Sequence, residues 1–356
     1  MFRLLDYYII RKFLGTYIFA IILILAIAIM FDINEKLDGF LKAPIKETIV
    51  DYFLNFIPYF ANQFAPLFTF IAVIFFTSKL AANSEIIAML STGMSYHRLL
   101  VPYMVSAAVI AASSFLLSAY VIPPANVKRI DFTNTYVKDR RVDYGTNIQL
   151  QVAPGEIAYM SRYDAVNKTG YKFSLESFKD KKIVSRLTAQ TIKWDTLNNW
   201  TVRDYMIRTF TGNREKITKG NRLDTVIPFE PRDFLISKHD QETLTSPELR
   251  LFIERQKMRG MAKTEVFEIE LQRRYAMTAA AFILTIIGMA LSSKKIKKGL
   301  GVNIGIGLLL SFSYILFMTI TSTFAVSGLT SAVVAMWIPN IIYSIIAFVI
   351  YFKVAR

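Results

Sequence analysis

The chain is divided by long stretches that contain no Asp, Glu, Lys or Arg. These uncharged stretches are Phe13 to Phe31, Tyr52 to Ser78, Leu99 to Val127, Tyr275 to Ser293 and Gly299 to Phe352. About 20 apolar residues cross the hydrocarbon core of a bilayer, so each of the first four predicts one membrane-spanning helix. The fifth is long enough for two helices with a turn at Ser327 to Ser331. The pattern therefore predicts an α-helical membrane protein with six transmembrane helices.

A polar region separates the third and fourth spans and shows a different period. Short segments alternate apolar and polar residues, as in Ile148 to Val152 and Trp200 to Tyr205, and turn residues such as Pro154-Gly155 lie between them. Period-two patterning broken at such spacing is typical of strands. We therefore predict an inserted all-β domain over residues 128–244, built as a sandwich or an open barrel.

The pattern becomes helical again before the fourth span. Thr245-Ser246-Pro247-Glu248 has the hydroxyl cap, early proline and following glutamate that start a helix. A second amphipathic stretch, Glu265 to Arg274, runs directly into the apolar residues that follow. The predicted organisation is transmembrane helices 1–3 in residues 1–127, the β domain in 128–244, connecting helices in 245–274 and transmembrane helices 4–6 in 275–356.

The stretch NSEIIAMLSTGMSYHR, residues 83–98, lies between the second and third spans and is too polar to cross a membrane. Asn83 or Ser84 is expected to cap a short helix over residues 84–92, and Gly93 to end it in the left-handed conformation. Ile86, Met89 and Leu90 form one apolar stripe. The helix would then present Glu85 to a docking partner. Alternatively, Glu85 is an ordinary solvated residue favoured in a first turn by the helix dipole.

Composition agrees with a membrane protein and removes several kinds of chemistry. Hydrophobic residues make up 53% of the 356 residues, and the mean hydropathy is +0.37. The chain has no cysteine, which excludes disulfides, thiolate metal sites and cysteine nucleophiles. The first apolar run exceeds a typical signal-peptide core and lacks a clear cleavage site, so we interpret it as an uncleaved anchor.

The distribution of basic residues predicts the orientation. Lys294 to Lys298 carries four lysines, and both chain ends are basic, whereas the segment Asp32 to Asp51 has five acids against three lysines. Lys and Arg accumulate in cytoplasmic loops, so both termini are predicted to be cytoplasmic. Much of the net charge of +15 reflects this bias, which weakens a nucleic-acid interpretation. The basic excess of the β domain suits an anionic amphiphile or a position near anionic lipid.

Motifs for energy conversion and catalysis are missing from the sequence. No Gly-x-x-x-x-Gly-Lys-Ser/Thr phosphate loop occurs, and the only two histidines, His97 and His239, lack a partner at metal-ligand spacing. Proton- or sodium-coupled carriers usually have acidic or basic residues within their spans, whereas none interrupts the apolar runs of this chain. We interpret Asn62 and Gln63 as residues that form hydrogen bonds between helices, in preference to a substrate site. We therefore expect no enzyme, no metal and no cofactor.

Several segments are similar to one known family. SEIIAMLSTGMS after the second span, the β domain after the third, KKGLGVNIGIGLLLSFSYILF and the late VAMWIPNII resemble the lipopolysaccharide-export permeases of the LptF/LptG type, also called YjgP/YjgQ. The resemblance covers essentially the whole chain. LLDYYIIRKFLGTYIF and Trp337 to Asn340 lean toward the LptG branch. One departure is Arg274 to Thr278, where the family pattern has a proline.

The resemblance implies a role, a fold and a set of partners. Six spans and a periplasmic β-jellyroll would form half of an inner-membrane ABC transporter permease in a Gram-negative bacterium, paired with a paralogous LptF/LptG-type subunit. An LptB-type cytoplasmic ATPase dimer would drive extraction of lipopolysaccharide, which passes to an LptC/LptA-type periplasmic β-jellyroll bridge. The alternative is a non-transporting mechanotransmission subunit that couples an ATPase to a periplasmic protein partner.

The resemblance also marks candidate site residues. The short helix over residues 84–92 would be the coupling helix that contacts the ATPase. The candidates for this contact are Ser84, Glu85, Met89 and Gly93. Basic residues near the far ends of the spans could contact lipid phosphates or could snorkel at the interface; these are Lys36, Lys42, Lys46, Lys128 and Arg129. Inward-facing residues of the β domain could contact lipid, and these are Leu150, Val152, Phe173 and Trp194.

Overall fold

The computed structural model describes residues 4–137, 144–179, 182–212, 214–231, 240–258, 264–293 and 300–355. The chain forms two compact units. One is helical and comprises Met1–Lys138, Glu242–Pro247 and Glu265–Arg356, and the other contains the strands and comprises Asp139–Gln241 and Glu248–Thr264.

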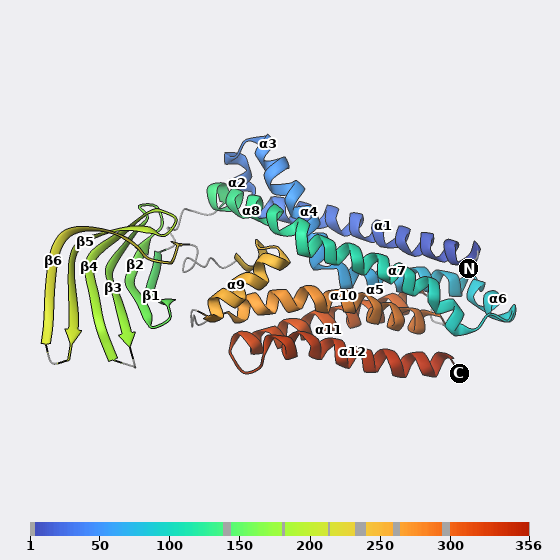
Figure 1. The fold of residues 1–356 in the computed structure, drawn as a ribbon. Helices are drawn as coiled ribbons and strands as arrows, with labels where there is room; N and C mark the ends of the chain where they lie inside the picture. The colour runs from blue at the N-terminus through green and yellow to red at the C-terminus, as the bar shows by residue number, and fades with distance from the viewer. Residues whose placement is uncertain are drawn as a thin grey trace. The chain divides into compact units, whose positions relative to one another are not determined.

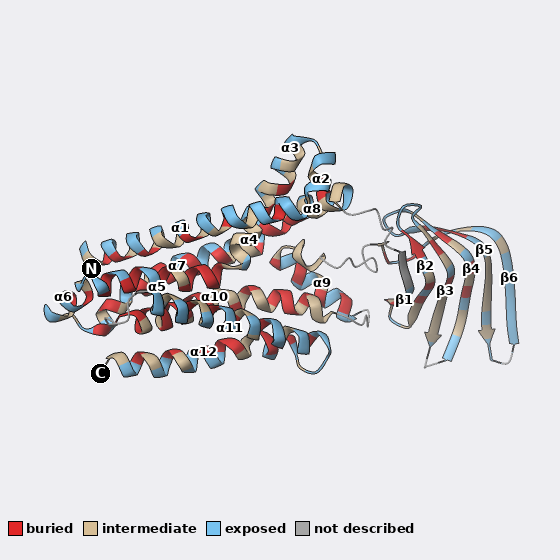
Figure 2. Ribbon diagram, turned by 180° about the vertical axis from the view of Figure 1, so that it is seen from behind, coloured by how far each residue is buried: buried red, intermediate tan, exposed pale blue. Residues whose placement is uncertain are grey.

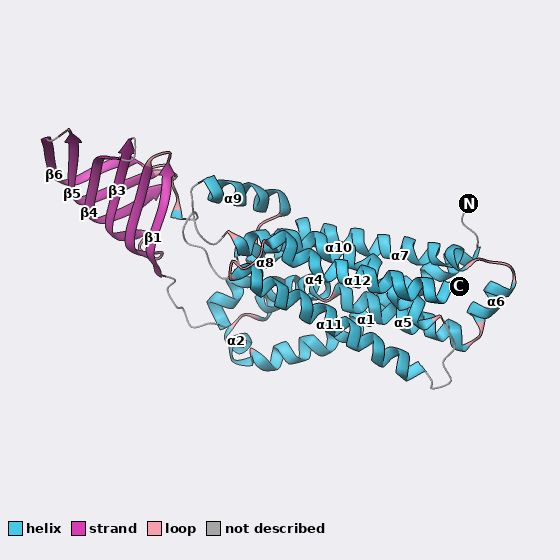
Figure 3. Ribbon diagram, turned by 90° about the horizontal axis from the view of Figure 1, so that it is seen from below, coloured by secondary structure: helices cyan, strands magenta, loops and turns pink. Residues whose placement is uncertain are grey.

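The described residues of the helical unit include six helices long and apolar enough to cross a membrane, which confirms the prediction of six spans (Figures 1 and 3). The third is one continuous helical stretch that includes two π-helical turns. The turn between the last two helices falls at 327–331 as predicted, and Gly328 there has φ +78°. The spans are α1 (Leu4–Glu35), α5 (Ala65–Ala82), Tyr96–Val137, α10 (Glu265–Ser292), α11 (Leu300–Val326) and α12 (Ala332–Ala355).

Shorter helices fill the segments between the spans. The predicted second span, Tyr52 to Ser78, is interrupted at Phe64, so only its second half forms the crossing helix α5. Pro66 lies in the first turn of α5, where its missing N–H is tolerated, whereas that N–H would be needed in a continuous helix. The elements between the spans are α2 (Leu37–Lys42), α3 (Ile45–Glu47), a π-helical turn (Thr48–Phe53), α4 (Leu54–Gln63) and α6 (Glu85–Ser91). The third span itself consists of α7 (Tyr96–Leu116), a π-helical turn (Leu117–Val121), α8 (Ile122–Phe132) and a second π-helical turn (Thr133–Val137).

Helices α5 and α10 form the centre of the helical unit (Figure 2). A Cβ atom on Gly288 of α10 would lie 2.2 Å from Val73 Cγ1 of α5, so this glycine allows the two helices to pack closely. In contrast, only 17% of the apolar window of α1 and 22% of that of α11 is buried, against 78% for α5. These two spans therefore expose the largest apolar faces of the unit.

The other unit contains one six-stranded antiparallel sheet in which the strands follow each other in chain order (Figure 3). This confirms the inserted β domain. The described strands form a single curved meander, whereas the alternation pattern had suggested a sandwich or an open barrel. The strands are β1 (Tyr144–Ala153), β2 (Glu156–Asp164), β3 (Thr169–Lys179), β4 (Lys182–Thr196), β5 (Asn199–Thr211) and β6 (Arg214–Val226).

The apolar core of the sheet lies along one face. Leu150 pairs with Ala158, which pairs with Leu175, and the same row continues through Leu187 and Ile207 on the next strands. Trp200 is fully buried and stacks on Phe229, with 4.5 Å between the ring centroids. Its Nε1–H donates to the Phe229 carbonyl at 3.0 Å.

Two helices follow the strands along the chain within the described residues. Helix α9 (Ser246–Met258) begins within the Thr245–Glu248 signal, and α10 runs from Glu265 through Arg274 into the apolar span. Arg274 to Thr278 stand where the family pattern has a proline, and α10 continues through these residues without a break.

Candidate functional site

The short helix α6 follows α5 after a tight turn. Gly93 has φ +85°, as predicted for the residue that ends this helix. Ser84 precedes the helix with φ +60° and makes no side-chain cap hydrogen bond, so the expected Asn83 or Ser84 cap is wrong. Asn83 instead donates from Nδ2 to Glu85 Oε1 at 3.0 Å. Its side chain therefore orients the glutamate rather than the helix backbone.

The predicted apolar stripe fixes how α6 sits on the helical unit. Ile86 and Met89 are buried in the main core, and Leu90 packs against it. Met89, a candidate for partner contact, therefore anchors the helix and does not reach its outer surface. Ile87 lies on the opposite side and is 55% exposed. This residue was missed because only the inward stripe gives a periodic signal.

Glu85 is held by uncharged donors. The Tyr8 hydroxyl on α1 donates to Glu85 Oε2 at 3.1 Å, and Asn83 binds the other oxygen. Within the described parts of the chain, Glu85 has no salt bridge to a cation. The half-buried carboxylate is thus oriented while its charge is left uncompensated, which favours pairing with a cation outside this chain.

The first turn of α7 binds three other spans directly beneath α6. Arg98 forms an ion pair with Asp6 of α1, whose side chain is only 3% exposed. His97 Nδ1 and the Tyr351 hydroxyl of α12 are 2.6 Å apart. The Tyr96 hydroxyl donates to Ser293 Oγ, at the end of α10, at 3.1 Å. The start of α7 is therefore bonded to α1 and α12 and to Ser293 directly after α10.

These contacts were not predicted from the sequence. The residues Tyr96, His97 and Arg98 stand out only as polar positions directly before an apolar run. Their partners lie up to 254 positions away along the chain, so local pattern carries no signal for the pairing.

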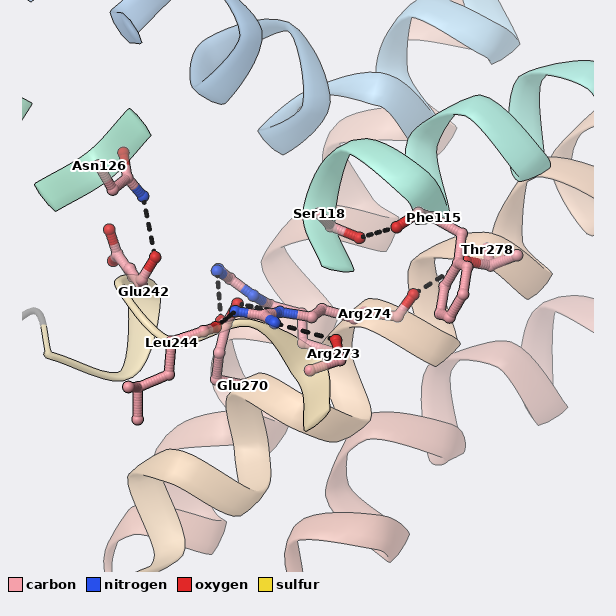
Figure 4. Close-up of polar contacts among 10 residues, drawn as sticks. Phe115, Ser118, Asn126, Glu242, Leu244, Glu270, Arg273, Arg274 and Thr278 are labelled. Atoms are coloured by element: carbon pink, nitrogen blue, oxygen red, sulfur yellow. Dashed lines mark hydrogen bonds and ion pairs between the residues drawn. The ribbon is translucent and has the colours of Figure 1, made fainter. Parts of the chain in front are cut away.

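A second polar cluster surrounds Arg274 in the first half of α10 (Figure 4). Arg274 of α10 is 4% exposed and donates through Nε to Glu270 Oε1, and through its terminal nitrogens to Ser246 Oγ and the Leu244 carbonyl, each at 3.0 Å. Arg273 binds the other Glu270 oxygen at 2.6 Å. The cluster fixes the segment before α9 onto α10.

The same segment is also held by α8. Asn126 Nδ2 donates to the Glu242 carbonyl at 3.3 Å (Figure 4). Arg129 Nε donates to Asn126 Oδ1 at 3.0 Å. The guanidinium of Arg129 lies 4.3 Å from the centre of the Tyr59 ring. A candidate for phosphate contact is thus already engaged in a structural network.

The other basic candidates fall into two groups. Lys36 is half-buried and binds Asp32 and the Tyr52 hydroxyl, so it too is partnered within the chain. Lys42, Lys46 and Lys128 are exposed. The prediction that these five cations contact lipid phosphates stays a prediction.

The interpretation of Asn62 as a helix–helix contact is confirmed. Its Oδ1 accepts a hydrogen bond from Ser114 Oγ of α7 at 2.6 Å. Both residues, together with Gln63, line a small cavity whose wall also includes Glu270 and Arg274.

The β-domain candidates lie on the apolar face of the sheet. Leu150, Val152 and Phe173 are buried, Trp194 packs against them half-buried, and Gln149 is exposed, as the alternation predicted. Among the described residues of the whole chain, no three His, Asp or Glu side chains converge as metal ligands.

Comparison with known proteins places this architecture in a family. A search among curated proteins found no match. A family model described as lipopolysaccharide export system permease LptF/LptG matches residues 7–353, nearly the whole chain. The chain, a multi-pass membrane protein with an inserted β domain, therefore belongs to the lipopolysaccharide export permease family LptF/LptG.

Proposed function

We propose that this chain is one permease subunit of an ABC transporter that extracts lipopolysaccharide from the inner membrane and passes it to a periplasmic bridge. The observation that carries this proposal is the oriented Glu85 carboxylate on α6, a helix anchored by Ile86 and Met89 with Ile87 exposed beside it. A docking ATPase supplies the missing cation. Since the sequence has no phosphate loop, ATP hydrolysis belongs to a separate LptB-type dimer.

Two exposed spans support pairing with a second permease subunit. Helices α1 and α11 bury the smallest fraction of their apolar windows within this chain. Gly305 of α11 is exposed, and a Cβ built on it meets no atom within 4 Å. Small residues on an exposed helix face allow close approach of another helix. A paralogous LptF/LptG-type subunit on these faces would enclose a cavity wide enough for a bulky glycolipid.

The sheet gives the glycolipid a route away from the membrane. Its apolar face carries Leu150, Val152, Phe173 and Trp194, which can receive acyl chains. An edge strand can extend to a similar LptC/LptA-type domain through main-chain hydrogen bonds. Photo-crosslinkers at Leu150 and Phe173 are expected to capture glycolipid, while one at the outward Gln149 is not.

The deciding experiment is purification of the chain with its ATPase and paralogous partner in membranes that contain lipopolysaccharide. Under this proposal, the complex retains lipopolysaccharide and releases it to a soluble β-jellyroll acceptor only when ATP is hydrolysed. A mechanotransmission subunit would instead hydrolyse ATP and remodel a periplasmic protein without retaining or releasing glycolipid. That result would replace the transport proposal with its alternative.

A further inference from the structure

A groove lies between α1 and α5 at the membrane face that carries both chain termini. Its volume is about 540 Å³, within the range of roughly 300–1,000 Å³ typical of small-molecule sites. Its wall consists of Tyr8, Arg11, Lys12, Gly15, Thr16 and Phe19 of α1 and Phe75 of α5. The six α1 residues recur at intervals of three and four, so they form one face of the helix.

The groove has basic residues at one end and exposed aromatic side chains further along α1. Arg11 and Lys12 lie at its outer end, just before the uncharged run that starts at Phe13. Phe19 is seven residues beyond Lys12, which places it about 10 Å deeper along a helix rising 1.5 Å per residue. Phe19 is 65% exposed and Phe75 44% exposed. This arrangement matches a lipid whose headgroup lies at the surface and whose acyl chains run inward.

The two cations are not neutralised inside the chain. Within the described residues neither Arg11 nor Lys12 forms a salt bridge. Lys12 Nζ lies 5.9 Å from the centre of the Tyr8 ring. Of the neighbouring acids, Asp6 is paired with Arg98, whereas Glu85 is held by Tyr8 and keeps its charge, so two cations face one unpaired acid. The groove therefore carries a net positive charge and attracts an anion.

Gly15 makes the groove accessible. A Cβ atom built at Gly15 meets no other atom within 4 Å, so a larger side chain would project into open space without a clash. Alanine and larger residues also favour a helix more than glycine does. Substitution at this position can thus fill the groove without disrupting α1.

We propose that this groove is a binding site for one anionic phospholipid of the membrane leaflet facing the termini, with its phosphate between Arg11 and Lys12 and an acyl chain along Phe19 and Phe75. The proposal concerns phospholipid held by this chain alone, so it does not depend on the transport proposal. Tyr8 lines the groove and also binds Glu85, so a bound lipid contacts the residue that positions α6.

The test measures retained lipid on the full-length chain, extracted from nanodiscs of phosphatidylglycerol and phosphatidylcholine in equal parts and analysed by native mass spectrometry. The wild-type chain is expected to retain phosphatidylglycerol. Arg11→Gln with Lys12→Gln should lower retention about thirtyfold, since each basic residue near an anionic surface is worth about 1 kcal/mol, or about fivefold. Gly15→Trp should abolish retention although both charges remain.

Two matched variants distinguish lipid binding in this groove from nonspecific attraction of anionic lipid to basic residues. Lys353 is exposed at the end of α12 on the same membrane face, and Gly305 also meets open space. Lys353→Gln and Gly305→Trp should both retain the lipid. Loss of retention in Lys353→Gln equal to that of the double variant would overturn the site, as would full retention in Gly15→Trp.

A last experiment uses the intact complex. A photo-crosslinker at Phe19 is expected to capture phosphatidylglycerol. Capture of a helix of another subunit, or of lipopolysaccharide in place of phospholipid, would show that a different occupant fills the groove and would refute the proposal.

Discussion

The Tyr8 hydroxyl of α1 donates a hydrogen bond to the Glu85 carboxylate of α6, with 3.1 Å between the two oxygens. This bond joins one of the least buried spans to the short helix that we propose as the ATPase contact. Asp6 and Arg98 join α1 to α7 close by. Movement of α6 is therefore expected to move α1, one of the two faces on which the partner subunit would pack.

Charge and orientation at Glu85 can be separated by three variants. Glu85→Gln keeps an acceptor for Tyr8 but loses the charge, and leaving a partner cation unpaired at an interface costs roughly 2–5 kcal/mol. Tyr8→Phe keeps the charge and loses one hydrogen bond, worth about 0.5–1.5 kcal/mol. Glu85→Lys adds repulsion. ATPase affinity measured with the purified chain should fall least in Tyr8→Phe and most in Glu85→Lys.

A charge reversal on the ATPase should recover part of the binding lost in Glu85→Lys. If Glu85→Lys binds the ATPase and exports normally, α6 is ordinary connecting structure and Glu85 is the solvated glutamate of the alternative interpretation.

Ile87 and Met89 offer a matched pair on α6. Ile87→Ala removes an exposed side chain and should weaken ATPase docking with little change in the melting temperature. Met89→Ala removes a buried one, which typically costs about 2–5 kcal/mol, and should lower the melting temperature. Docking affinity and thermal unfolding of both variants test this. Equal docking affinities in Ile87→Ala and the wild type would move the contact away from this surface.

Hydropathy was sufficient to predict the number of spans, because a segment that crosses a bilayer must satisfy every backbone hydrogen bond within a long apolar helix. It did not predict the break at Phe64. Alternation in β1 likewise predicted that Leu150 faces inward and Gln149 outward. The single meander was not predictable in this way, since alternation indicates which face is buried and not which strands pair. Asp6 and Arg98 show the same limit, because contact across 92 positions leaves no local pattern.

The Arg274 cluster is expected to stabilise the helical unit. Arg274→Gln removes hydrogen bonds from a charged group, worth about 1.5–3 kcal/mol each, to Ser246 and the Leu244 carbonyl. The melting temperature of the detergent-purified variant should fall below that of Lys42→Gln, which alters an exposed cation. Equal melting temperatures for the two variants would show that the cluster contributes nothing measurable.

Topology can be tested on a chain that contains no native cysteine. A single cysteine at the exposed position Ser91 of α6 should react with an impermeant thiol reagent only from the cytoplasmic side. One at Gln149 of β1 should react only from the periplasmic side. Ile296 belongs to the basic loop and lies outside the described residues. A cysteine there that reacts from the periplasm would contradict the orientation.

The last prediction concerns the turn between β2 and β3. The pKa of the Asp164 carboxyl lies below its ordinary value of 3.8, chiefly because the Asn167 side chain donates to it at 2.7 Å and the backbone N–H groups of Asn167 and Val166 donate as well. A lowered pKa in the folded chain stabilises it above the ordinary pKa, and this contribution disappears as pH falls through the lowered value.

Asp164→Asn should therefore unfold at a lower temperature than the wild type at neutral pH, and the difference should vanish in acid. Tryptophan fluorescence reports the transition, because Trp194 and Trp200 lie in the sheet. Asp204 is the control: it is an exposed carboxylate in the same sheet, and asparagine tolerates its positive φ of 52°, so Asp204→Asn should lower the unfolding temperature at neutral pH less than Asp164→Asn does. A difference for Asp164→Asn that persists unchanged in acid would mean that the side chain acts through shape rather than through its charge.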